Sequence, residues 1–400
     1  MTELATQNKF ERAEDGVFAS SVSHEFAYTD GAESERKLHQ ILNSTADLSS
    51  DSEELEGQID DWPSEYHLSR KRSNLLRPLN LEGVERVLEL GCGCGAISRY
   101  LGEQSGLQID SVEGSRVRAG LAASRCRDLD NVRVHCANFN DLAIPTNHYD
   151  MVLLVGVTEY AGRFSERETD QQALQDMLTM AQAALRPNGV VVIAIENRLG
   201  LKYLLGACED HYGRPWLGVD NYPQSEGIRT YSKPEWEQQI RTAGFAASRF
   251  CYPFPDYKIP TLVLDEAAIS SENSLEALSR IKSRDYLQVF EIKEESRVWS
   301  GLVQAEIADQ SANSFLIVLG QSHDAVERLA TFGVAEYQGQ DFNWHEPEID
   351  ANTRRLQNKL GAVTEQRDQL GAEIQLYKSS KALKLLQGIR RLFGGGVSKD

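Results

Sequence analysis

The chain has 400 residues, 41% of them hydrophobic, and a formal net charge of −18 at pH 7. This length exceeds one ordinary domain, so we expect a globular core with appended segments. The acidic balance disfavours a nucleic-acid partner, because neutralising phosphates requires clustered lysine and arginine. No apolar run reaches the roughly 18 residues of a membrane helix. The first residues show no basic-then-apolar signal pattern, so a cytoplasmic location is expected.

Acidic residues are concentrated at the start of the chain. Residues 1–65 hold sixteen Asp or Glu and four Lys or Arg. Residues 1–60 also lack sustained periodicity, so we expect an acidic, partly disordered N-terminal region. The six cysteines fit neither a zinc pattern nor a disulfide framework, which predicts reduced thiols and no metal site.

Apolar segments alternate with helical patterns over the middle of the chain. This alternation predicts an α/β domain with a doubly wound parallel sheet over residues 61–320. A helix over Thr169–Ala184 and a capped helix beginning at Ser232 lie between predicted strands. The predicted strands are Arg86–Leu90, Gln108–Glu113, Val132–Cys136, Tyr149–Val155, Val190–Ile195, Ala247–Tyr252, Thr261–Leu264 and Ser314–Leu319.

The first of these strands ends in a loop with glycine at every second position. The run is Val-Leu-Glu-Leu-Gly-Cys-Gly-Cys-Gly over residues 87–95. Glycines let the backbone turn at positive φ and let a ligand lie against bare main chain. The helix that begins at Ala96 directs its amide end toward such a ligand. We therefore expect Gly91, Cys92, Gly93 and Gly95 to bind a cofactor.

The spacing Gly91-x-Gly93-x-x-Ala96 also satisfies the dinucleotide fingerprint, so NAD is an alternative. Glu89 distinguishes the two ligands. A carboxylate at the mouth of the loop repels a pyrophosphate but suits S-adenosylmethionine, which carries an ammonium and a sulfonium. The stretch resembles the first motif of class I S-adenosylmethionine-dependent methyltransferases. The resemblance implies a Rossmann-like, seven-stranded sheet and S-adenosylmethionine as cofactor, with Glu89 in its site.

Other strand ends supply further cofactor-binding candidates. Glu113 ends the second strand, where a carboxylate accepts hydrogen bonds from both ribose hydroxyls. In the methyltransferase interpretation Asn138 accepts from the adenine amino group through its side-chain oxygen, and Phe139 covers the ring. Tyr66 and Arg70, upstream of the first strand, are predicted to close over the methionine end.

A long irregular insertion over residues 197–229 follows the fifth strand and is predicted to build the substrate site. Methyl transfer needs no metal in principle, but an oxygen nucleophile must lose its proton. A histidine of near-neutral pKa is the natural base. His211 is the candidate, with Asp210 or Glu159 orienting its ring. His67 is the competing candidate.

Several segments resemble a narrower bacterial subgroup of this family. They are Trp-Pro-Ser-Glu-Tyr-His-Leu-Ser-Arg from residue 62, Ile-Glu-Asn-Arg-Leu-Gly-Leu-Lys-Tyr from residue 195, Glu-Asp-His from residue 209 and Pro-Phe-Pro-Asp-Tyr-Lys from residue 253. The subgroup is associated with lipopolysaccharide and other surface-polysaccharide synthesis, beside or fused to glycosyltransferases. The resemblance implies O-methylation of a sugar hydroxyl of a surface polysaccharide or its lipid-linked precursor. The alternatives are a small-molecule or protein acceptor, and a non-catalytic scaffold for glycosyltransferases.

The C-terminal segments show different patterns. Residues 321–349 are interpreted as a linker, and a heptad over residues 350–377 predicts a coiled coil that would allow a homo-oligomer. Residues 378–400 form a basic amphipathic tail. Such a tail can bind an anionic membrane at its inner face or pack on a protein neighbour.

Overall fold

The computed structural model describes residues 2–20, 31–223, 226–286 and 295–330, without the side chains of Phe139 and Ser296. The chain divides into two units, residues 1–59 with 63–346, and residues 60–62 with 347–400. The fold below is that of the first unit. The predicted coiled coil and basic tail lie outside the described residues.

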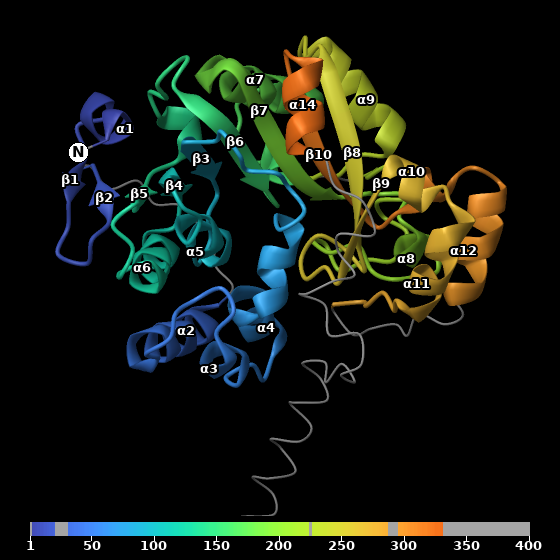
Figure 1. Cartoon of the computed structure of the whole chain (residues 1–400), viewed down its shortest axis with the longest axis horizontal. Helices are drawn as coiled ribbons and strands as arrows, with labels where there is room; N and C mark the ends of the chain where they lie inside the picture. Colours follow the sequence, from blue (N-terminus) through green and yellow to red (C-terminus); the bar gives the residue numbers. More distant parts are fainter. Residues whose placement is uncertain (1, 21–30, 224–225, 287–294, 331–400) are drawn as a thin grey trace, which may run out of the picture. The chain divides into compact units, whose positions relative to one another are not determined.

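One mixed sheet organises this unit (Figure 1). Its order is β1-β2-β5-β4-β3-β6-β7-β10-β8-β9. The expected count of seven strands is therefore wrong, because the sheet is extended at both edges. The strands are β1 (Glu11–Arg12), β2 (Phe18–Ala19), β3 (Arg86–Leu90), β4 (Gln108–Glu113), β5 (Val132–Cys136), β6 (Tyr149–Val155), β7 (Leu185–Glu196), β8 (Ala247–Phe254), β9 (Leu262–Asp265) and β10 (Ser314–Gly320).

Strands β5, β4, β3, β6 and β7 are parallel, as the alternating pattern predicts. Strand β10 is inserted antiparallel between β7 and β8. The strand order reverses at β3, from which successive strands run outward in both directions. In open α/β sheets a ligand binds beyond the carboxyl ends of the strands at this reversal. The loop after β3 lies there.

Helices cover both faces of the sheet (Figure 1). Helices α7 and α9 pack on one face, while α5, η1 and α14 pack on the other. The helices are α1 (Glu3–Gln7), α2 (Ala32–Ser44), α3 (Glu53–Glu56), α4 (Trp62–Leu68), α5 (Ala96–Gly102), α6 (Arg116–Arg125), α7 (Asp170–Ala184), α8 (Leu201–Leu204), α9 (Lys233–Thr242), α10 (Glu266–Ile269), α11 (Leu275–Arg280), α12 (Glu295–Gln304), α13 (Ala308–Ser311) and α14 (His323–Leu329), with 3₁₀ helices η1 (Arg70–Leu75), η2 (Phe139–Asp141), η3 (Thr158–Tyr160) and η4 (Glu272–Ser274).

Strand β7 shows why a continuous apolar run belongs at the centre of this sheet. Val191, Ile193 and Ile195 enter the core on one face, while Val192 and Ala194 enter the core on the other. Successive side chains of a strand point to opposite faces, so a strand covered on both sides is apolar throughout. Glu196, the polar last residue of β7, lies at the carboxyl edge of the sheet.

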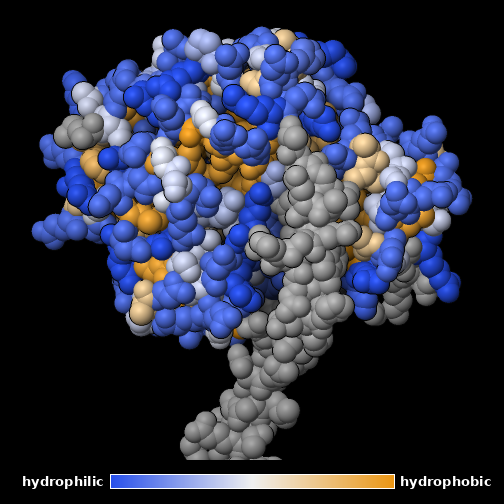
Figure 2. Space-filling model, in the orientation of Figure 1, coloured by the Kyte–Doolittle hydropathy of each residue, from blue (hydrophilic) through white to orange (hydrophobic). Residues whose placement is uncertain are grey.

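The surface is more polar than the interior. Figure 2 shows a mostly hydrophilic face with smaller hydrophobic areas among the polar ones. Within the part of the chain that the structure describes, no helix combines the length and apolarity needed to cross a bilayer.

Candidate active site

The glycine loop after β3 is held against its neighbours by its backbone. The amides of Gly91 and Cys92 both donate to the carbonyl of Val112, at 2.8 and 3.0 Å. Gly91, Gly93 and Gly95 have φ values of +81°, +56° and +80°. L-residues with a side chain rarely adopt this conformation. The predicted positive-φ turn is therefore confirmed.

The three glycines face different surroundings. A Cβ added at Gly91 would lie 2.4 Å from Val157 Cγ2, and one at Gly95 would lie 2.9 Å from Ala122 Cα. At Gly93 the nearest atom is His67 Cε1, at 4.0 Å. Gly91 and Gly95 are thus needed for packing, whereas the bare face of Gly93 is open. Gly93 is the position at which a ligand can lie against the loop.

Glu89 lies below the loop and is 2% exposed. Its Oε2 accepts hydrogen bonds from Ser98 at 2.5 Å and Ser111 at 2.9 Å. Burial raises the pKa of this carboxyl to about 6, although both hydroxyls favour the ionised form. Glu89 is therefore a buried acid whose charge depends on pH close to neutrality.

Glu113 lies on the other side of the loop, at the end of β4. Its Oε2 accepts from the Gly93 amide at 2.9 Å, and its Oε1 accepts from the Ser115 amide at 2.8 Å. The structure thus places this carboxylate against the glycine loop, where its predicted role with the ribose hydroxyls requires it. That role stays a prediction.

Tyr66 and Arg70 contact different residues in the structure. The Arg70 guanidinium lies 3.9 Å from Glu53 in α3. Arg72 instead lies over the Tyr66 ring, 4.2 Å from its centroid, and donates to the Lys258 carbonyl. The sequence reasoning missed Arg72, whose cation also lowers the pKa of Glu89.

The segment after β5 holds the remaining cofactor candidates. The side-chain oxygen of Asn138, predicted to accept from adenine, accepts from the Asn140 amide at 3.1 Å. That contact stabilises the turn into η2. The side chain of Phe139 lies outside what the structure describes. Cys92, a candidate in the glycine loop after β3, is 7% exposed, and burial raises the pKa of its thiol well above the ordinary value.

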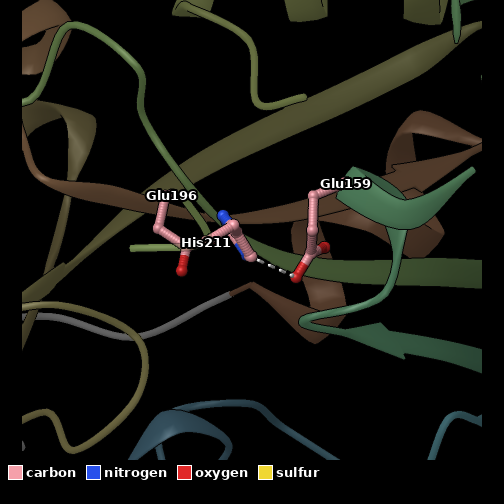
Figure 3. A group of neighbouring side chains, drawn as sticks. All are labelled: Glu159, Glu196 and His211. Carbon is pink, nitrogen blue, oxygen red and sulfur yellow. Dashed lines mark ion pairs between the residues drawn. The ribbon is translucent and has the colours of Figure 1, made fainter. Parts of the chain in front are cut away.

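A second group of polar side chains gathers at the carboxyl ends of the next two strands. Glu159 follows β6 in η3, Glu196 ends β7, and His211 comes from the insertion. One side-chain atom of each lies within 4.8 Å of the other two (Figure 3). Glu159 Oε1 is 3.6 Å from His211 Nε2. We call these three residues the His–Glu cluster.

The histidine ring is oriented by a residue that the sequence reasoning did not assign. His211 Nδ1 lies 2.8 Å from Glu209 Oε1. Glu209 also accepts from the Tyr222 hydroxyl at 3.2 Å and, through Oε2, from the His211 amide at 2.9 Å. Tyr160 meets the ring edge-on, with centroids 5.4 Å apart. The imidazole orientation is thus fixed from two sides.

These neighbours control the protonation of His211. Burial alone would lower its pKa, but the neighbouring carboxylates of Glu159 and Glu209 raise it well above the ordinary value. Such an imidazole holds its proton at neutral pH. The expected near-neutral pKa is therefore wrong for this arrangement of side chains.

The two carboxylates of the cluster are buried and incompletely paired. Glu159 is 3% exposed and Glu196 is 1% exposed. Among the described residues, Oε2 of each has no hydrogen-bond partner. Glu196 Oε1 does receive hydrogen bonds, from Tyr257 at 3.3 Å and from Lys258. Burial raises the pKa of Glu159. Both Oε2 atoms are therefore buried acceptors without a donor among the described residues.

Asp210 does not orient the His211 ring. Its Oδ2 lies 3.2 Å from Lys202 Nζ and 2.6 Å from Lys258 Nζ. Burial alone would raise the pKa of Asp210, but these two lysines hold it well below its ordinary value. Lys202 is fully buried and also contacts Asp256, at 3.4 Å. This network fixes the insertion on the loop after β8.

The competing histidine, His67, is 3% exposed and belongs to the other side of the site. Its carbonyl accepts from Arg125 at 2.6 Å, and its ring meets Tyr66 edge-on at 5.0 Å. His67 is therefore next to the glycine loop, whereas His211 is next to Glu159 and Glu196.

One sequence signal would have found Glu196. Like Glu113, it is the acid that ends a strand of the parallel sheet. Glu209 and Lys258 gave no such signal, because their roles depend on contacts with the folded insertion.

Comparison with known proteins identifies the central region. Residues 62–248 match the family model described as a methyltransferase domain. The ubiquinone biosynthesis O-methyltransferase of Bradyrhizobium diazoefficiens is 28% identical over 154 residues, which cover 37% of this chain and 54% of that protein. The cyclopropane-fatty-acyl-phospholipid synthase of Escherichia coli K12 is 28% identical over 92 residues, 23% of each protein. The chain thus spans about half the length of the first relative and less than a quarter of the second.

Solved structures include similar chains at lower identity. Haemonchus contortus phosphoethanolamine N-methyltransferase 2, in complex with S-adenosyl-L-methionine, is 15% identical with a TM-score of 0.40, over 70% of this chain and 61% of that one. A Thermotoga maritima methyltransferase is 17% identical with a TM-score of 0.37, over 63% and 88%. The family match covers slightly less than half of the chain, and it describes residues 62–248 as a methyltransferase domain.

Proposed function

We propose that this chain transfers the methyl group of S-adenosylmethionine to a hydroxyl oxygen of a sugar in a bacterial surface polysaccharide or its lipid-linked precursor. The observation that carries the transfer to oxygen is the His–Glu cluster. Its unpartnered carboxylate oxygens lie at the same edge of the sheet as the glycine loop. A hydroxyl oxygen must lose its proton as it is methylated, and carboxylate oxygens of this kind can accept that proton.

The reaction is an in-line displacement. The acceptor oxygen forms a bond to the methyl carbon while the carbon–sulfur bond breaks, leaving S-adenosylhomocysteine. The hydroxyl proton passes to the cluster, with the free Oε2 of Glu159 as its acceptor. A positioned carboxylate of raised pKa suits this step, because it can hold a proton that a surface carboxylate would release. Burial excludes competing water.

Two observations support a sugar as acceptor. The motifs over residues 195–213 and 253–258 resemble those of the surface-polysaccharide subgroup, and in the structure both segments meet at the cluster, where Lys258 contacts Glu196. Trp216, also in the insertion, is 51% exposed with a φ of +69°. A flat apolar side chain held at the surface in an unusual conformation suits contact with a ring of the acceptor.

A small aromatic alcohol is the second candidate. It is favoured by the similarity to ubiquinone biosynthesis O-methyltransferases. Either acceptor would transfer its proton to the His–Glu cluster. Selection between a sugar and an aromatic alcohol would therefore depend on the residues of the insertion.

The test uses methyl-labelled S-adenosylmethionine with the full chain. The acceptors are lipopolysaccharide and lipid-linked glycans of the producing bacterium, a set of phenols, and a protein extract. We expect label in the glycan fraction, and at least a hundredfold slower transfer by Glu159→Gln with unchanged cofactor affinity. Label in phenols alone would select the second candidate. Cofactor binding without transfer to any fraction would contradict the proposed activity.

A further inference from the structure

The His–Glu cluster has the composition of a cation site as well as that of a proton acceptor. It combines one imidazole nitrogen with two carboxylates, all with atoms within 4.8 Å of one another. Zinc and manganese accept this mixture of nitrogen and oxygen ligands, whereas magnesium prefers oxygen ligands and water. The three ligands come from three separate segments, so the fold itself assembles them.

The unpartnered atoms supply an independent indication. Oε2 of Glu159 and Oε2 of Glu196 are buried without a hydrogen-bond partner among the described residues. A buried carboxylate oxygen with no donor is costly, and native structures seldom contain one without a function or a bound group. Here two such oxygens belong to residues of the same cluster.

Glu209 prepares the histidine for metal binding. Its contact with His211 Nδ1, at 2.8 Å, holds that nitrogen as the hydrogen-bond donor and leaves Nε2 directed toward Glu159. Metal-binding histidines nearly always donate their other ring nitrogen to a carboxylate or carbonyl, which fixes the tautomer and the ring orientation. Glu209 makes this contact while anchored by backbone amides of His211 and Tyr212.

The local charge also favours a cation. Within the described ranges, the ion pairs of Glu159, Glu196 and Glu209 go to His211 and Lys258. Three buried carboxylates thus share one lysine and one imidazole, which leaves excess negative charge in a region with little water. Buried charges are stable when they are paired or coordinate a metal.

We propose that Glu159, Glu196 and His211 bind one divalent cation of the zinc or manganese type, with Glu209 orienting His211. The ligand atoms of a tetrahedral ion with bonds of about 2.1 Å lie roughly 3.4 Å from one another. Side-chain rotation would bring the ligand atoms of the three residues to this distance. The ion takes the place of the proton on Nε2. The cysteine spacing predicted no metal site, and the proposed site differs from that prediction because it uses no cysteine. A bound ion and the proton of an acceptor hydroxyl would compete for Glu159, so metal binding is measured without an acceptor.

The experiment measures Mn²⁺ and Zn²⁺ binding to the metal-free full chain by calorimetry, with thermal unfolding of the same samples. We expect one ion per chain and a raised Tm. Glu159→Gln and His211→Asn should each weaken binding more than tenfold, and Glu209→Gln should weaken it about 10–100-fold. His39→Ala, which changes an exposed histidine, is the control and should bind as the parent does.

Three results would overturn the site. They are no binding of either ion to the parent chain, binding unchanged in Glu159→Gln and His211→Asn, and equal loss in His39→Ala. Circular dichroism of each variant confirms folding, and Glu196→Gln provides a further ligand variant if one of the others unfolds. S-adenosylmethionine binding to the same samples distinguishes a failed metal site from a protein that lacks the cofactor site.

Discussion

Glu89 illustrates how a single buried side chain links the fold to ligand affinity. Its carboxylate is surrounded by Ser98 and Ser111, with the charges of Arg72 and Glu113 nearby. Burial favours the protonated form and raises the pKa to about 6. The ionised form is the one that attracts a cationic ligand. Affinity for S-adenosylmethionine should therefore depend on pH just below neutrality.

We predict that affinity for S-adenosylmethionine falls as the pH decreases from 7.5 to 5. The free protein takes up a proton on Glu89 as the pH passes through about 6, and each further pH unit lowers affinity by at most tenfold. Glu89→Gln should bind more weakly at pH 7.5 and show little change down to pH 5. Calorimetry at several pH values measures both. An equal pH dependence in the parent and the variant would assign the effect to another group.

At the scale of elements, the glycine loop joins the cofactor and acceptor sides of the site. Gly91 packs directly against Val157, the residue before η3, which carries Glu159. The loop therefore positions η3 as well as offering backbone to a ligand. Gly93 offers backbone to a ligand but does not position η3. The only atom within 4 Å of a Cβ added at Gly93 would be His67 Cε1, at 4.0 Å.

Gly93→Ala should separate ligand binding from folding. Its φ of +56° makes alanine unfavourable by about 1–2 kcal/mol, without a clash. Gly106→Ala is the matched control, because Gly106 has a φ of +84° and no atom within 4 Å of an added Cβ. Both variants should lose similar free energy of unfolding, but only Gly93→Ala should weaken S-adenosylmethionine binding at least tenfold. Comparable affinities in the two variants would show that the ligand does not lie against Gly93.

The elements that the sequence predicted best are those with the strongest local signals. The bounds of β3, β4, β5 and β6 agree with prediction because each contains aliphatic residues and is followed within two residues by glycine or asparagine. The capped start of α9 is also confirmed, with Glu235 accepting from the Ser232 amide at 2.8 Å. Strands β1 and β2 were missed, since two residues each cannot show periodicity. They are formed by pairing with each other and with His135 and Cys136 of β5.

Site residues were also predictable from the sequence only where a local pattern marked them, and not where their role depends on long-range contacts. Glu89 and Glu113 could be predicted because strand ends of a parallel sheet meet at one edge. The partner of His211 could not, because Asp210 and Glu209 are adjacent in sequence and only the folded insertion decides which faces the ring. Arg72 was missed for a similar reason. Its partner Lys258 lies 186 residues away in the chain.

At the scale of the whole molecule, the described fold places the glycine loop and the His–Glu cluster at one edge of a single sheet. The loop follows β3, and the cluster follows β6 and β7, the next strands in the sheet order. Under the proposed function, the methyl donor binds beside the loop and the acceptor binds beside the cluster. Methyl transfer by this arrangement requires first that the loop binds S-adenosylmethionine.

The most direct test of that claim is calorimetric titration of the full chain with S-adenosylmethionine and, separately, with NAD. Glu89 and Glu113 border the loop, so we predict that one S-adenosylmethionine binds per chain and that NAD gives no measurable binding. Binding of NAD without S-adenosylmethionine, by a chain shown to be folded, would contradict the account.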